Sequence, residues 1–285
     1  MSKLQTFIRW IDRLQQKHRV VAFSVAVISK YNDDGVGWHA AMLTYYSFLS
    51  LFPLLLLLTT VVNSVLGNDS HTKMIIIKGL TDYFPLIGNQ LSNDVHKLHT
   101  SGLALIAGFI FLIYGTRGVA NAFSKSVQDI WGIPLHHRDV FPKTFFKSFL
   151  LVITGGIGLL TASVIASLAS AAGKGLDFRL LSIGINFFIL FWLFRLLLDL
   201  SLPTHVPLKE TRIGAGASAI GLIIIQLLGG YIISHELKHL NSLYSYFAIT
   251  LGLLFWLYLQ SQVIYYSIEI ALVSSRKLWP KRLTT

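Results

Sequence analysis

A long uncharged stretch from Trp38 to Val62 limits what this chain can fold into more than any other feature of the sequence. It contains no Asp, Glu, Lys or Arg, and about 20 apolar residues in a helix are enough to cross the roughly 30 Å hydrocarbon layer of a bilayer. Hydroxyl-bearing residues crowd its first half, whereas Leu54 to Leu58 is leucine alone. We therefore expect a membrane-spanning helix with one half facing protein and the other facing lipid.

Pro53 divides this stretch into its two halves. Proline has no amide hydrogen and its ring presses on the carbonyl four residues earlier, so the helix should bend there. Tyr46, Ser50 and Pro53 share one side of the helix at steps of four and three residues. Two interpretations remain open: these residues line an intramembrane path, or they pack a kinked helix against its neighbours with their hydroxyls bonded locally.

The composition extends the membrane interpretation to the whole chain. Of 285 residues, 53% are hydrophobic and 13% are charged, whereas about 25% are charged in a soluble domain; the mean hydropathy is +0.62. The absence of cysteine excludes disulfides, thiolate metal sites and cysteine nucleophiles. No phosphate-binding glycine loop with its lysine occurs, so we expect no ATPase. The sequence also shows no convincing Ser/His/Asp arrangement and no soluble acidic cluster of the kind that holds two metals, so we expect no enzyme activity and no cofactor.

The apolar segments predict an all-α polytopic membrane protein with six transmembrane helices plus amphipathic interfacial helices. Residues 1–37 form a cytoplasmic amphipathic arm, residues 38–275 the six-helix membrane domain, and residues 276–285 a basic cytoplasmic tail. After the first span, a second begins at residue 103, and the remaining four are expected at about 146–172, 180–202, 213–234 and 246–273. Between the first two spans, the residues from 67 to 102 are expected to form amphipathic helices on the outer surface.

The formal net charge of +11 is distributed unevenly about these spans. Of the 24 Lys and Arg residues, 17 fall on the side of the termini: six in the N-terminal arm, five between Arg117 and Lys147, two after the fourth span and four in the tail. Cytoplasmic segments carry such an excess, so both termini are expected in the cytoplasm. The partners of this charge are then membrane lipids with anionic headgroups, not nucleic acid; a homo-oligomer or an envelope partner is left open.

Small residues at four-residue steps predict where helix backbones approach closely. The third span carries such a ladder and the fifth span carries a matching set, so we expect these two spans to form a close pair. The ladder consists of Gly158, Ala162, Ala166 and Ser170, and the matching set includes Gly214, Ser218 and Gly221.

Charged side chains inside the predicted spans are pointers to function, because each costs at least about 2.5 kcal/mol near the centre of a membrane. Arg195 in the fourth span and Glu269 in the sixth would pair if these spans are neighbours. The alternative is that Arg195 and Asp199, one turn apart, reach toward the interface. The candidate lining of a substrate path is Tyr46, Ser50, Pro53, Arg195, Gln262 and Glu269.

The segment from His235 to His239, HELKH, matches the H-E-x-x-H pattern. In that pattern two histidines one helical turn apart bind zinc and the glutamate activates water. The segment lies at the end of the fifth predicted span and has no identifiable third ligand; His96 and His99 are candidates by topology alone. The alternative is a polar helix end with interfacial histidines, so a zinc hydrolase is the less favoured hypothesis.

The order of these segments resembles the YihY family of bacterial inner-membrane proteins, also called the BrkB virulence-factor family. The resemblance rests on Ala40 to Leu58, on Ile130-Trp131-Gly132, on Phe194 to Pro203 and on Tyr244 to Glu269. It implies a multi-pass protein of the bacterial inner membrane, with transport or lipid and envelope roles suspected. Relatives once carried the label ribonuclease BN, which nothing in these residues supports.

From the residues and this resemblance, we expect a transporter or flippase-like protein that acts on a lipid or another amphiphilic anion. The alternative is a structural or scaffolding membrane protein of the cell envelope, in which the small residues serve packing and the charges serve as anchors.

Overall fold

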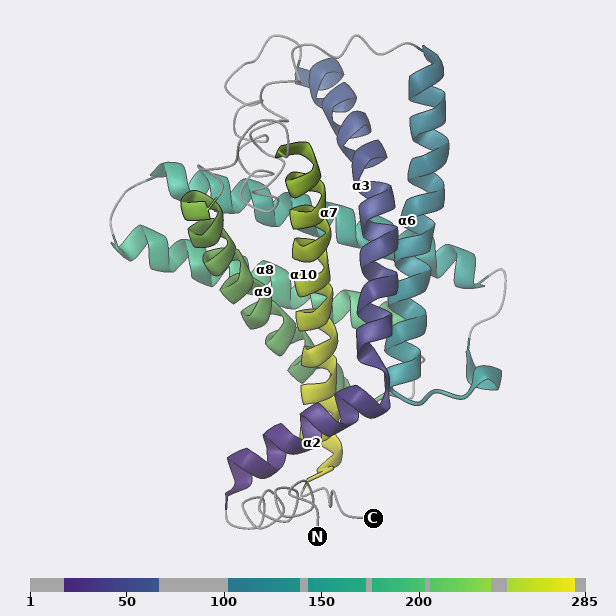
Figure 1. The fold of residues 1–285 in the computed structure, drawn as a ribbon, viewed down its shortest axis with the longest axis vertical. Helices are drawn as coiled ribbons and strands as arrows, with labels where there is room; N and C mark the ends of the chain where they lie inside the picture. The colour runs from purple at the N-terminus through teal and green to yellow at the C-terminus, as the bar shows by residue number, and fades with distance from the viewer. Residues whose placement is uncertain are drawn as a thin grey trace.

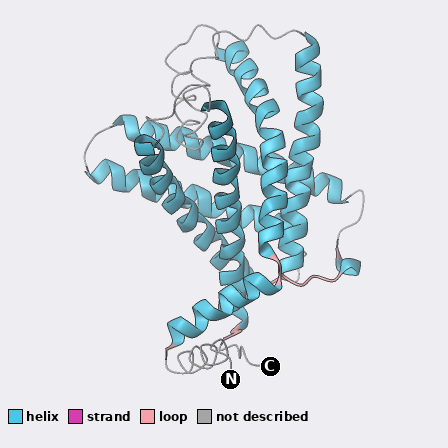
Figure 2. Cartoon of the chain, viewed as in Figure 1, coloured by secondary structure: helices cyan, strands magenta, loops and turns pink. Residues whose placement is uncertain are grey.

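The computed structural model describes residues 18–66, 102–138, 143–172, 176–202, 206–236 and 245–279. The regular elements within these ranges are all helical, as predicted (Figure 2). The expected arm up to residue 17, the outer segment 67–101, the end of HELKH and the tail from residue 280 lie outside the described residues. The helices are α2 Arg19–Asp33, α3 Val36–Leu66, α6 Gly102–Ile130, the short 3-10 helix η1 Leu135–His137, α7 Lys143–Ala172, α8 Leu176–Ser201, α9 Leu208–Glu236 and α10 Ser245–Arg276.

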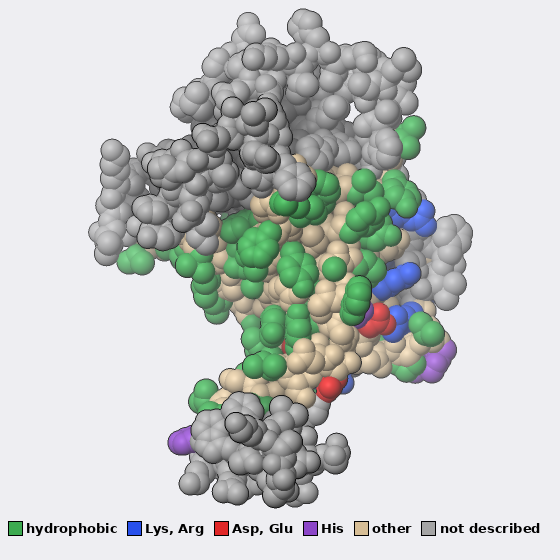
Figure 3. All heavy atoms as spheres, in the orientation of Figure 1, with side chains coloured by type: hydrophobic (Ala, Val, Ile, Leu, Met, Phe, Trp, Pro, Cys, Tyr) green, Lys and Arg blue, Asp and Glu red, His purple; other side chains and the backbone are tan. Residues whose placement is uncertain are grey.

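The long helices have membrane dimensions. They contain between 26 and 32 residues, and at about 1.5 Å per residue each is longer than the roughly 30 Å hydrocarbon layer. Within the described residues, two segments are long and apolar enough to cross a membrane by length and composition: Leu180–Ser201 in α8 and Lys209–Gly229 in α9. Hydrophobic side chains cover the middle of the visible face, and charged ones gather along its right and lower margin (Figure 3).

The helices form a fan, not a parallel bundle (Figure 1). In this view α3, α6 and α10 stand upright, α7 and α8 run across them, and α9 is oblique. Among the described residues, α3 packs mainly on α6, α10 on α9, and α7 on α8. The short α2 lies across the lower end of α10.

Helix α3 continues through Pro53 to Leu66. Its upper half leans relative to its lower half in Figure 1. Within α3, the side chains of residues 52–66 are not described. The lipid-facing leucine run therefore stays a prediction.

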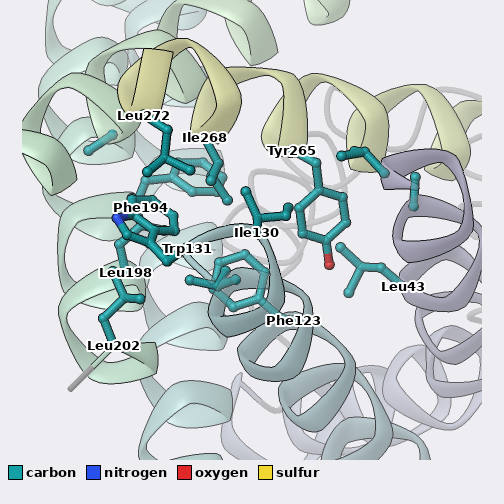
Figure 4. Close-up of a cluster of buried hydrophobic side chains, with 14 of the residues drawn as sticks. Leu43, Phe123, Ile130, Trp131, Phe194, Leu198, Leu202, Tyr265, Ile268 and Leu272 are labelled. Atoms are coloured by element: carbon teal, nitrogen blue, oxygen red, sulfur yellow. The ribbon is translucent and has the colours of Figure 1, made fainter. Parts of the chain in front are cut away.

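The buried core lies where α3, α6, α8, α9 and α10 converge. Tyr265 of α10 points toward Phe123 of α6 and Leu43 of α3, while Ile268 of α10 lies on the side of Phe194 of α8 (Figure 4). Large apolar side chains on the outer faces of α7, α8 and α9 are instead exposed, among them Phe149, Phe188 and Leu228. A soluble protein rarely exposes so much apolar surface, whereas lipid covers it at no cost.

The predicted close pair of the third and fifth spans is not found among the described contacts. Among the described contacts, α7 touches α8 and α6 but not α9. Gly158 receives Leu193 of α8, and Gly221 receives Val263 of α10, so closely that a methyl group at either glycine would overlap the partner. Gly214 is close to both α8 and α10, and Ser218 is buried. A ladder of small residues predicts a helix face that another backbone can approach, but it does not specify which helix packs there. The side chains of Ala162, Ala166 and Ser170 are not described.

Candidate functional site

A buried charge cluster joins α2 to α10 at the lower end of the fan. The side chain of Glu269 is fully buried, and its Oε2 lies 3.4 Å from Lys30 Nζ. The same ammonium group forms an ion pair with Asp34 and donates a hydrogen bond to the Ile130 carbonyl oxygen at 3.4 Å. A buried carboxylate is tolerated only when it is paired or neutralised, so Lys30 is essential to this arrangement.

Aromatic and apolar contacts extend the junction between α2 and α10. The Tyr31 hydroxyl donates a hydrogen bond to Gln262 Oε1, and the Tyr31 ring stacks on Tyr266 with 4.1 Å between centroids. Burial raises the pKa of the Tyr31 phenol, which therefore stays a hydrogen-bond donor at neutral pH. Further along, Phe23 meets Trp279 edge to face at 5.4 Å.

The path of the chain explains how Lys30 reaches Glu269. Helix α2 ends at Asp33, and Gly35 follows with φ of +61°, a backbone conformation that glycine adopts without strain. The chain then turns sharply into α3, which leaves α2 lying against α10. Sequence reasoning missed Lys30 because it was counted only as one basic residue of the N-terminal arm.

The expected pair between Arg195 and Glu269 is not formed. Arg195 Nε lies 3.5 Å from Asp199 Oδ2 on its own helix, and its guanidinium lies 5.9 Å from the Trp192 ring centroid. Helix α8 contacts α6, α7 and α9 but not α10 among the described residues. The reason is that α9 packs on both α8 and α10 and separates the helices that carry Arg195 and Glu269.

A second polar cluster fastens the helix ends near Trp131. The Trp131 indole donates a hydrogen bond to Glu210 Oε2 at 2.8 Å, and Arg276 Nε lies 3.5 Å from Glu210 Oε1. Gln128 of α6 donates to the Ser201 carbonyl oxygen of α8 at 2.8 Å. The Ile130-Trp131-Gly132 segment, noted in the sequence only for its resemblance, therefore ties α6 to α9 and to the end of α10.

Tyr46 and Ser50 pack against glycines of α6. A methyl group at Gly115 would lie 2.9 Å from the Ser50 Cα, and one at Gly118 would overlap the Tyr46 ring. Ser50 Oγ donates to the Ser47 carbonyl oxygen at 3.0 Å. These contacts are those of the packing interpretation, with the hydroxyl bonded within its own helix.

A half-open cavity of about 220 Å³ lies where α3, α6, α7, α8, α9 and α10 meet. Its walls are mostly apolar, and its polar groups are Ser47 of α3 with Gln260 and Ser261 of α10. Five of the residues predicted to line a path have described side chains, and none of these borders the cavity: Tyr46, Ser50, Arg195, Gln262 and Glu269. The side chain of the sixth, Pro53, is not described. The sequence predicted Gln262 as a lining residue, but its side chain accepts a hydrogen bond from Tyr31. Gln260, two residues earlier on α10, lines the cavity in its place, because residues two apart on a helix face different directions.

A second hollow of about 460 Å³ lies beside the turn between α2 and α3. Tyr31, Trp38 and Tyr258 supply its aromatic lining. Trp38 is 84% exposed, which suits a residue placed at the interface between membrane and water.

The zinc hypothesis gains no support from the described residues. Helix α9 includes His235 and Glu236, but His239 lies outside the described part of the chain. Within that part, no group of three or more His, Cys, Asp or Glu side chains is arranged to hold a metal ion.

Comparison with known proteins places the chain in a family. It is 24% identical over 273 residues to Inner membrane protein YhjD of Escherichia coli (strain K12), covering 85% of this chain and 78% of the relative. It is 24% identical over 274 residues to a UPF0761 membrane protein of Stenotrophomonas maltophilia (strain R551-3), covering 91% of this chain and 62% of that protein. The chain thus spans less than two thirds of the Stenotrophomonas protein's length.

No solved structure matches the chain. A family profile described as "Virulence factor BrkB" matches residues 27–283, which include every described helix except the first turns of α2. Because the match covers most of the sequence, this chain belongs to the BrkB virulence factor family.

Proposed function

We propose that this chain is a flippase-like transporter of the bacterial inner membrane that moves a lipid or another amphiphilic anion and hydrolyses no ATP itself. Membrane residence is supported by the two apolar helical segments in α8 and α9 and by the names of the relatives. The observation that carries the transport proposal is the half-open cavity of about 220 Å³, which all six long helices line.

The proposed topology has six spans, α3 and α6 to α10, with both termini in the cytoplasm. Contacts near Trp131 bring together the end of α6, the end of α8, the start of α9 and the end of α10. The start of α3 joins them through the turn after α2. Successive helices therefore alternate in direction, and the basic residues at this end, Arg138 and Arg276 among them, suit the cytoplasmic side.

The chemistry of the cavity fits an amphiphile. Its apolar walls suit an acyl chain, and the group of Ser47, Gln260 and Ser261 offers hydrogen bonds to an ester or a headgroup. At about 220 Å³ the cavity is smaller than the roughly 300–1,000 Å³ of a typical ligand pocket. It accommodates part of one chain, so passage of a headgroup requires the helices to separate.

Two adjacent glycines of α7 allow a matched test. Gly155 lines the cavity, and a methyl group added there would lie 3.9 Å from Leu197. A methyl group added at Gly156 would meet no described residue within 4 Å. Gly155→Leu should fill the cavity and slow lipid movement about tenfold or more. A tenfold change corresponds to the loss of about 1.4 kcal/mol of binding free energy between the lipid and the cavity. Gly156→Leu should leave the rate unchanged.

The measurement uses purified protein in vesicles that contain a trace of fluorescent phosphatidylglycerol, with a membrane-impermeant quencher reporting the fraction that crosses. Thermal unfolding of each variant controls for folding. Wild-type vesicles that move the lipid no faster than protein-free vesicles would overturn the proposal, and equal rates in the two leucine variants would remove the cavity from it.

The second candidate function is a structural or scaffolding role in the envelope. The packing of Tyr46 and Ser50 onto α6 favours it, because these hydroxyl-bearing side chains line neither of the two cavities described above. A defined partner crosslinked to folded protein, together with no lipid movement, would support this function over transport.

A further inference from the structure

The cluster of Lys30, Asp34 and Glu269 has one positive charge too few. Both carboxylates contact the single ammonium group of Lys30, so the fully ionised cluster carries a net charge of about −1 by the ordinary charges of these groups. Glu269 is fully buried, and neither of its carboxylate oxygens accepts a hydrogen bond from a described residue. An uncompensated charge at such a position is costly.

No other cation among the described residues supplies the missing charge. On α9, Glu210 holds Arg276, and at the end of α6, Asp129 holds Arg138. From α3, His39 approaches Tyr265, one turn before Glu269, with 6.3 Å between the ring centroids. Tyr31 and Gln262 are bonded to each other. Among the described residues, the cluster therefore lacks one compensating positive charge, which a proton from solution can supply.

We propose that this cluster is a proton-binding site, in which Glu269 takes up one proton from the cytoplasmic side, and that the bound proton holds α2 against α10. A metal cation is disfavoured, since it requires several oxygen ligands and the described residues offer no such set. Asp34 is 25% exposed and Lys30 is 18% exposed, so these side chains connect the buried carboxyl group with water.

The direction of the coupling follows from which state binds the proton better. With α2 docked, Glu269 is buried and the protonated carboxyl group is the less costly form. With α2 released, Glu269 is hydrated and ionised. A proton binds the docked state more tightly and so favours docking, and loss of the proton favours release.

The turn between α2 and α3 makes release mechanically simple. Gly35, with φ of +61°, is the hinge, and the ties that oppose release are the Tyr31 contacts and the apolar cluster around Val273. The inference concerns the position of α2 and does not depend on which substrate the protein moves.

Spin labels on the folded protein in lipid nanodiscs test the coupling, because the chain contains no cysteine and introduced ones are unique. Labels at Ser24→Cys on the exposed side of α2 and at Phe255→Cys on α10 report the distance between these helices. From about pH 6 to about pH 9.5 the wild type should gain a longer-distance population, because deprotonation releases α2. Glu269→Gln, which stays neutral, should keep the short distance throughout.

Two further variants should shift the transition in opposite directions. Asp34→Asn leaves Lys30 to neutralise Glu269 alone, so α2 should stay docked about one pH unit or more higher than in the wild type. Lys30→Gln removes the only cation, so release should begin at lower pH. His39→Gln and Asp199→Asn are controls and should respond as the wild type does.

Infrared difference spectra between the same two pH values identify the ligand as a proton, since they should show a carboxylic-acid carbonyl band that Glu269→Gln removes. A wild-type distance that does not change with pH, or a Glu269→Gln variant that follows the wild type, would overturn the inference. A response to sodium in place of potassium at constant pH would replace the proton by a metal cation and also overturn it.

Discussion

At the scale of single residues, Glu210 shows how one carboxylate serves several helix ends. It is 6% exposed, accepts a hydrogen bond from the Trp131 indole and lies beside Arg276. Hydrogen bonds to charged groups are worth about 1.5–3 kcal/mol, and removing one partner leaves the other buried and unsatisfied. Asp199 is a useful contrast, since it is 34% exposed and pairs with Arg195 along one helix.

Replacing these two carboxylates should therefore have unequal effects. Glu210→Ala should lower the free energy of unfolding by about 2–3 kcal/mol, because the Trp131 indole loses its acceptor in a buried position. Asp199→Ala should cost about 0.5 kcal/mol, as expected of a partly exposed pair within one helix. Thermal unfolding in detergent, followed by Trp fluorescence, measures both; equal losses would show that the Trp131 contact contributes little.

At the scale of helices, glycines set how closely α3 and α6 approach. Tyr46 lies against Gly118 and Ser50 lies against Gly115, so the two backbones are separated by very little side-chain material. In a membrane such contact is a main source of helix association, because lipid removes the usual hydrophobic driving force. Gly156 of α7 is the opposite case, since a methyl group added there would have no described neighbour within 4 Å.

Alanine at Gly118 and alanine at Gly156 should have different effects on the free energy of unfolding. Gly118→Ala should destabilise the protein by about 1–3 kcal/mol, because its methyl group overlaps the Tyr46 ring and the helices must shift. Gly156→Ala should be neutral or slightly stabilising, since alanine is the better helix former by about 1 kcal/mol. The thermal unfolding assay used for Glu210 compares them, and a stable Gly118→Ala protein would contradict the close packing of α3 on α6.

At the scale of the whole molecule, the fan brings most connections to one end. The turn between α2 and α3, the end of α6, the end of α8, the start of α9 and the end of α10 all meet near Trp131. The proposed topology assigns that end to the cytoplasm because of its basic residues.

Labelling of single cysteines tests this assignment. Cysteines at Arg138 and Lys277 should react with a membrane-impermeant maleimide in inverted vesicles but not in spheroplasts. A cysteine at Ser245, at the start of α10, should show the reverse pattern. A cysteine-free sample is the control, and labelling of Arg138 and Lys277 positions from opposite sides would exclude the six-span arrangement.

Much of the helical framework was predictable, while the candidate site was mostly not. The segment around Pro53, the fourth span expected at about 180–202 and the family resemblance are visible as patterns in consecutive residues. Tyr31 and Gln262, by contrast, are 231 residues apart and meet only because α2 folds back on α10. The cavity residues Gln260 and Ser261 could have been inferred only from knowledge of which face of α10 points inward.

The sequence by itself determined the all-α character and the membrane-like surface, because apolar length and helical spacing are local properties of the chain. Only the tertiary structure decided the partners. Gly158 accepts α8 where α9 was expected, and Glu269 pairs with Lys30 where Arg195 was expected. The physical reason is that a smooth face or a buried charge specifies the kind of partner it needs, whereas the geometry of packing selects which partner arrives.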